Sequence, residues 1–260
     1  MSDHDQARGL RRLFGASQAR STLAVIGAGG TAVTLNLAST LAGLGKRVLV
    51  LDRTCGEAAI ALGLRARYEL AHVLDGDKTL HEVLLEGPRG MTLLPAARGL
   101  ARADADLAIR QVLFDSLAPD AARFDVWLVN GLPMRLADDA GDLLLVASPD
   151  RAAITRAYAL LKHIVRDGIP GRFRFVVNRA PSESEALVAY RNIADAARRF
   201  LAARLEYCGY IPREAGPRSV RAGEAVRLAD AKSAMGHAFA LLAASVVPTP
   251  AAALPHALAV

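Results

Sequence analysis

A glycine-rich turn is the segment of this sequence best suited to chemistry. It follows a short apolar run and precedes a helical pattern, and it consists of Gly27, Ala28, Gly29, Gly30, Thr31 and Ala32. Glycines in such a turn let backbone N–H groups approach an anion, and the positive end of the following helix attracts negative charge. The turn therefore predicts a binding site for phosphate or pyrophosphate.

The elements around the turn predict a parallel sheet. An apolar strand over 47–51 ends at Asp52, so the turn lies within a βαβ unit. Continuously apolar runs, typical of strands covered on both faces, occupy 124–129, 142–147 and 173–177. Further strands fit 91–97 and 205–211, and helices fit 103–118, 150–167, 184–202 and 232–246. We expect an α/β fold with a doubly wound, mostly parallel sheet flanked by helices.

Composition limits the function classes. The 260 residues are 52% hydrophobic, enough for a sizeable core, and the net charge of +6 suits an acidic partner or a solvated Arg-rich surface. We favour the solvated surface and expect no nucleic acid. The isolated Cys55 and Cys208 fit a reducing cytosol, so we expect a cytoplasmic protein. The six histidines have no ligand spacing, and no apolar stretch reaches the ~20 residues of a membrane span.

The turn fits two kinds of nucleotide site. Residues 27–32 match the GxGxxA pattern of dinucleotide-binding folds, and Asp52 lies where a ribose-binding acid belongs. Alternatively, Leu-Asn-Leu-Ala at 35–38 aligns the turn with the phosphate loop of ParA/MinD-class ATPases. That alignment puts Thr31 at the magnesium-binding hydroxyl, and it puts Val25 and Gly30 where the class carries lysines.

Four other segments resemble a single family. Residues 5–11 match its DQAxxLR amino-terminal motif, and the others are 147–162 (ASPDRAAITRAYALLK), 176–179 (VVNR) and 205–212 (LEYCGYIP). The chain thereby resembles, over roughly 5–245, the FlhG/FleN (YlxH-like) flagellar-number regulators of the MinD/ParA P-loop ATPase class. The resemblance implies a MinD/ParA-like α/β domain over 21–246. It also implies nucleotide contacts from residues 27–32, Asn178 and Pro212, with ATP and magnesium as cofactors.

Several groups that this resemblance requires are absent. Val25 and Gly30 occupy the two positions where the family has lysines. Thr54 occupies the position of the water-positioning aspartate, and Asn130 occupies that of the aspartate that supports magnesium. Asp52 and Thr31 survive. Phosphoryl transfer depends on charge stabilisation and positioning, and removal of one such group can cost ~10²–10³ in rate. We therefore expect a degenerate ATPase site, with Asp52, Thr54 and Asn130 as remnants and ATP–magnesium binding reduced or lost.

We expect the amino-terminal segment 1–20 to form a short helix followed by a linker. Such a helix is marginal alone in water, so we expect it to fold on a partner. The resemblance implies that this helix docks on the signal-recognition-type GTPase FlhF and stimulates GTP hydrolysis. The residues carried over are Asp5, Gln6, Ala7, Leu10 and Arg11. A flagellar transcription regulator and flagellar switch proteins are further partners left open. The basic stretch 213–232 keeps a DNA- or transcription-factor-binding role open, although solvated loops explain it as well.

The carboxyl-terminal residues 247–260 are rich in Pro and Ala and contain no Lys or Arg. We expect them to be disordered, and their composition argues against membrane association. The oligomeric state, a homodimer included, stays open. Three hypotheses remain: a degenerate flagellar regulator that binds protein, an active ATP-dependent switch with unorthodox residues, and an NAD-binding oxidoreductase. We favour the first.

Overall fold

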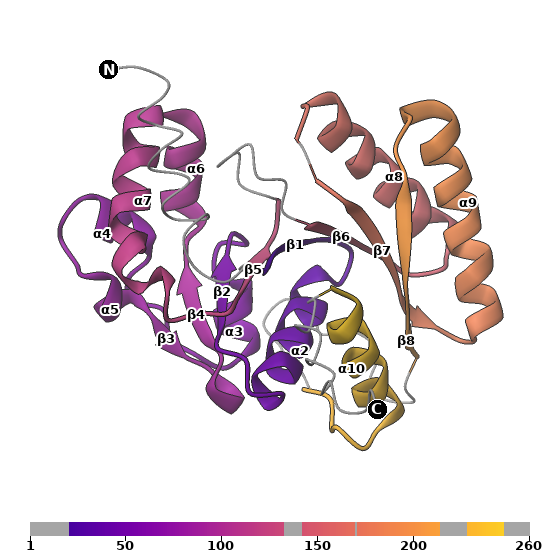
Figure 1. Cartoon of the computed structure of the whole chain (residues 1–260), viewed down its shortest axis with the longest axis horizontal. Coiled ribbons are helices and arrows are strands. Elements are labelled where there is room, and N and C mark those ends of the chain that lie inside the picture. Colours follow the sequence, from indigo (N-terminus) through magenta and orange to yellow (C-terminus); the bar gives the residue numbers. More distant parts are fainter. Residues whose placement is uncertain (1–20, 133–141, 170, 214–227, 247–260) are drawn as a thin grey trace, which may run out of the picture.

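The computed structural model describes residues 21–132, 142–169, 171–213 and 228–246. They form an eight-stranded sheet of order β3-β4-β2-β5-β1-β6-β7-β8, with helices on both faces (Figure 1). The strand pairs are parallel except for β3 with β4. This architecture confirms the predicted doubly wound sheet. The expected amino-terminal helix and carboxyl-terminal tail lie outside the described residues.

The strands are β1 (Ser21–Gly27), β2 (Val48–Asp52), β3 (Leu85–Glu86), β4 (Thr92–Pro95), β5 (Val126–Asn130), β6 (Asp142–Ala147), β7 (Phe173–Ala180) and β8 (Leu205–Pro212). The helices are α2 (Gly30–Gly43), α3 (Glu57–Ala61), α4 (Leu70–Leu74), α5 (Leu80–Val83), α6 (Ala97–Ala105), α7 (Leu107–Ala121), α8 (Arg151–Arg166), α9 (Glu183–Leu201) and α10 (Ala234–Val246), with a 3₁₀ turn η1 (Pro88–Gly90). No described helix is long and apolar enough to cross a membrane.

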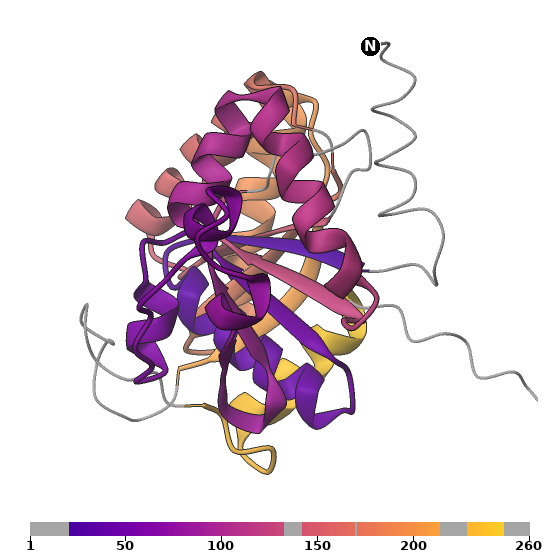
Figure 2. The ribbon, with the colours of Figure 1, turned by 90° about the vertical axis from the view of Figure 1, so that its left-hand side faces the viewer.

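Helices cover both faces of the sheet (Figure 2), and the core has a layer of buried side chains on each face. Leu23 and Val25 of β1 pack toward α2, α3 and α10, whereas Ala24 joins the cluster under α4, α6 and α7. Ile26 joins a third cluster beneath α8 and α9. Side chains alternate between faces along a strand, and both faces here are covered. This is why the strands are continuously apolar in sequence.

One predicted helix is wrong in being continuous, and two short helices were not predicted. The range 103–118 contains two helices, α6 and α7, separated at Asp106. The Asp106 carboxylate accepts hydrogen bonds from the N–H groups of Ala108 and Ile109, so it caps α7 instead of continuing α6. The polar stretch before Asp77 contains α4, and α5 follows it. Helices this short carry too little periodicity to be detected.

The strand order brings distant residues to one edge of the sheet. Val25 of β1 pairs with Asn130 of β5, and Asn130 pairs in turn with Asp52 of β2. On the other side, Gly27 pairs with Val146 of β6. The carboxyl ends of these parallel strands therefore surround the glycine turn, which is where open α/β sheets bind ligands.

Candidate functional site

Two glycines allow the turn to pass close to neighbouring strands. Gly27 has φ 109°, and a Cβ there would lie 2.1 Å from the carbonyl oxygen of Val146. Gly29 has φ 86°, and a Cβ there would lie 2.7 Å from Nδ2 of Asn178. Both positions therefore need glycine. No side chain caps the start of α2, so its first N–H groups face the exposed turn.

Asp52 is buried at the end of β2, with 1% of its surface exposed. Its Oδ1 accepts hydrogen bonds from the backbone N–H of Thr54 (3.0 Å), the Thr54 hydroxyl and Nδ2 of Asn130 (3.0 Å). Its Oδ2 accepts one from the N–H of Ala58 (3.2 Å). Four protein donors thus satisfy the carboxylate, as a buried charge requires.

Asn130 is the centre of the polar network beside the turn. Its Nδ2 lies 3.3 Å from Thr31 Oγ1, 3.0 Å from Asp52 Oδ1 and 3.2 Å from Thr54 Oγ1. Its Oδ1 accepts a hydrogen bond from Thr34 at 3.4 Å. The structure therefore brings Thr31, Asp52, Thr54 and Asn130 together, although they are far apart in the sequence.

Two members of the site were not identified from the sequence. The Thr31 hydroxyl donates to the carboxylate of Glu57 at 3.0 Å, which places an acid at the exposed mouth of the turn. The hydroxyl of Thr34 lies 2.9 Å from the carbonyl oxygen of Gly30 and 3.4 Å from Oδ1 of Asn130, so its single hydrogen is shared between two acceptors. Glu57 and Thr34 match no part of the phosphate-loop motif, so no motif in the sequence points to either residue.

Little positive charge reaches the turn from its own segment. No Lys or Arg occurs between Ser21 and Gly45. Val25 is 1% exposed and packs in the core. Arg53, which could have replaced a lysine, forms an ion pair with Asp104 of α6 at 2.6 Å. Within this segment, the attraction for an anion therefore comes from the backbone and the helix end.

Magnesium does not fit the residues present. Mg²⁺ requires oxygen ligands at about 2.0–2.1 Å in near-octahedral geometry. Here the amide nitrogen of Asn130 lies among three oxygens at 3.0–3.3 Å. The Asp52 carboxylate already accepts hydrogen bonds from that amide and from neighbouring hydroxyl and backbone groups. No reaction step through a metal can be derived from this arrangement.

Glu57→Gln should strengthen anion binding at the turn. The substitution removes a negative charge and keeps a side chain that can bond the Thr31 hydroxyl. We expect about a fivefold lower dissociation constant for ATP in EDTA, about 1 kcal/mol for an exposed charge. Calorimetric titration measures it, and Glu86→Gln on β3 is the control. Unchanged or weaker binding would show that the Glu57 carboxylate does not repel the ligand.

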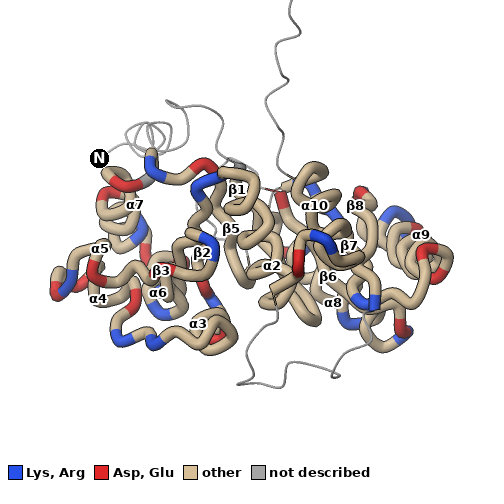
Figure 3. Tube along the Cα trace, turned by 90° about the horizontal axis from the view of Figure 1, so that it is seen from below, with Lys and Arg blue, Asp and Glu red and all other residues tan. Residues whose placement is uncertain are grey.

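Asn178 and Pro212 lie at the same edge of the sheet as the turn. Asn178 approaches Gly29 and pairs with Ile211, and Pro212 pairs with Ala180. The predicted partner-binding residues 5–7, 10 and 11 lie outside the described part of the chain. Along the described elements, Lys and Arg are interspersed with Asp and Glu in Figure 3, as in a solvated mixed surface.

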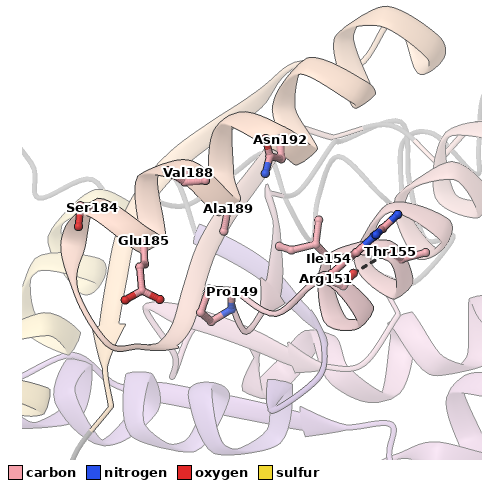
Figure 4. Close-up of a pocket in the computed structure, with 9 residues that line it drawn as sticks. All are labelled: Pro149, Arg151, Ile154, Thr155, Ser184, Glu185, Val188, Ala189 and Asn192. Carbon is pink, nitrogen blue, oxygen red and sulfur yellow. Dashed lines mark hydrogen bonds between the residues drawn. The ribbon is translucent and has the colours of Figure 1, made fainter.

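A concavity of about 610 Å³ lies between α8 and α9 (Figure 4). Pro149, Ile154 and Val188 give it an apolar lining, and Arg151 and Glu185 carry its charges. Its α8 wall comes from the family-like segment 147–162. None of the predicted nucleotide-binding residues lines it, so it is separate from the glycine turn.

Comparisons with known proteins agree on one family. The chain is 34% identical to the antiactivator FleN of Pseudomonas aeruginosa, over 88% of this chain and 86% of FleN. It is 26% identical to the flagellum site-determining protein YlxH of Helicobacter pylori, over 71% of this chain and 66% of that protein. The MinD cell division protein of Aquifex aeolicus superposes with a TM-score of 0.61 at 25% identity, covering 87% and 96% of the two chains.

No protein-family model matches the chain. Identity to FleN over most of both chains and the MinD-like fold nevertheless agree with the amino-terminal motif and the aligned turn. The chain belongs to the FleN/FlhG (YlxH-like) family of flagellar regulators within the MinD/ParA class.

Proposed function

We propose that this chain regulates flagellar assembly or number as a protein-binding module and does not hydrolyse ATP. The observation that carries the proposal is Asn130, whose amide donates a hydrogen bond into the Asp52 carboxylate where the class places a second acid. Loss of both turn lysines supports it. The module stimulates an FlhF-type GTPase through the amino-terminal DQAxxLR segment, and a flagellar transcription regulator or switch protein is a further partner.

An active ATP-dependent switch is the second candidate. The glycine turn, Thr31 and the uncapped start of α2 favour it, because these backbone groups are still suited to bind phosphate. The NAD-binding alternative is not retained, because the family similarity extends over most of the chain and explains the same glycines.

Gln6→Ala should separate GTPase stimulation from binding. In single-turnover GTP hydrolysis by an FlhF-type GTPase with the full-length chain, we expect about a tenfold or greater loss of stimulation, because a glutamine can orient the attacking water. The apparent affinity should change little. Leu10→Ala should instead weaken binding, since it removes an apolar anchor.

Gln18→Ala is the matched control, because it makes the same change in the linker, outside the motif. It should leave stimulation unchanged. Absence of stimulation by the wild-type chain at saturating concentration, or equal stimulation by wild type and Gln6→Ala, would refute the proposed role of this segment.

A further inference from the structure

The hydrogen bonds around Asn130 fix the direction of its amide. The Asp52 carboxylate can only accept, so the nitrogen of the amide must face it. Thr54 donates its hydroxyl to Asp52, and Thr31 donates its hydroxyl to Glu57. Both hydroxyl oxygens can therefore accept, and the two hydrogens of Asn130 Nδ2 are shared between the Asp52 carboxylate and these oxygens, which lie at 3.2 and 3.3 Å.

The amide nitrogen occupies a position suited to a small cation. Three oxygens from three separate segments converge on it: the start of α2, the end of β2 and the loop after β2. With an aspartate at 130, two buried carboxylates would face each other at about hydrogen-bond distance. Such a pair is strongly unfavourable unless a cation or a proton lies between its members.

We infer that the side-chain amide of Asn130 replaces a divalent cation, so that the chain links the glycine turn to the loop after β2 without metal. The link is complete in the protein alone. Thr34 and Gly30 join Asn130 to the turn, and Thr54 and Ala58 join Asp52 to the loop and to α3. The spatial relation of these segments is then independent of ATP and of magnesium. Proteins that bind this edge of the sheet meet a single arrangement of it.

Thermal unfolding of full-length protein in EDTA and in millimolar magnesium chloride tests this inference. Wild-type melting should be the same in both. Asn130→Asp should melt about 6–12 °C lower in EDTA, as expected when a buried polar pair is broken in a domain of this size, and should recover most of the loss in magnesium.

Asn36→Asp is the matched control, because Asn36 is a buried asparagine of α2 whose hydrogen bonds within the described ranges go to backbone groups, those of Ala32 and Ala229. It should lose stability equally in EDTA and in magnesium. The inference is overturned if magnesium stabilises the wild type, or if Asn130→Asp responds to magnesium no more than Asn36→Asp does.

If Asn130→Asp does not fold, manganese binding to the wild type decides. Electron paramagnetic resonance should show no saturable binding of Mn²⁺ at Asp52. A saturable Mn²⁺ site in the wild type that is lost in Asp52→Asn would overturn the inference. These readouts do not use a flagellar partner. Failure of the proposed GTPase stimulation is therefore distinguishable from failure of this inference.

Discussion

Purified full-length protein incubated with ATP and magnesium should release phosphate no faster than a Thr31→Ala variant. Phosphoryl transfer needs positive charge on the phosphates and a positioned water, and each lost group can cost ~10²–10³ in rate. With Val25 and Gly30 at the lysine positions, we expect turnover at least ~10⁴ below that of an intact site. Single-turnover hydrolysis of labelled ATP measures it. Turnover at a MinD-like rate that Thr31→Ala abolishes would favour the active switch.

Restoring charge to the turn should restore affinity before it restores hydrolysis. Gly30 tolerates a side chain, because its Cβ would lie 3.6 Å from the Val25 carbonyl oxygen, an ordinary contact. Gly30→Lys should therefore lower the dissociation constant for ATP by about tenfold, the effect of one charge-assisted contact. Gly43→Lys adds the same charge at the opposite end of α2, where nothing lies near the Cβ, and should have no effect.

Hydrolysis should require Thr54→Asp and Asn130→Asp in addition to Gly30→Lys. The first returns a carboxylate that can position water, and the second returns an acid that can support magnesium. If Gly30→Lys leaves ATP binding as weak as Gly43→Lys does, the alignment of the turn with the phosphate loop is wrong.

The long elements of the fold were predictable because burial on both faces marks their sequences. Strand 142–147 is continuously apolar after its first residue, and the helices over 150–167 and 184–202 have a clear apolar stripe. The region between β2 and β4 was not predictable in detail. Its short helices α4 and α5 begin at the capping residues Glu69 and Thr79, and local hydrogen bonds, more than periodicity, define them.

Only those residues of the site that align with a known motif could be predicted from the sequence. Thr31, Asp52, Thr54 and Asn130 follow from aligning the turn and the strand ends, and the structure places them in one network. Glu57 joins them through the fold of a loop after β2, and no spacing in the sequence specifies its contact with Thr31. The hydrogen bond that Arg53 donates to Asp104 has the same origin, since it joins the residue after β2 to helix α6, and the two residues are 51 positions apart.

Gly27→Ala should destabilise the protein far more than Gly30→Ala. At Gly27 the φ of 109° is unfavourable for alanine, and the new Cβ would lie 2.1 Å from the backbone oxygen of Val146 in a central strand. We expect a loss of about 3–5 kcal/mol in the free energy of unfolding. Gly30 begins α2 without a positive φ, so Gly30→Ala should change stability by less than about 1 kcal/mol.

Urea unfolding monitored by circular dichroism measures both variants in the absence of nucleotide. A large loss at Gly27 alone would show that folding requires this glycine whether or not phosphate binds, because β1 and β6 must pair beside the turn. The match of Gly27 to a glycine of the phosphate-loop motif would then give no support to nucleotide binding, because folding alone would explain it. Similar effects of the two substitutions would instead show that the turn can move away from β6, and the close approach at Val146 would not be a constraint on folding.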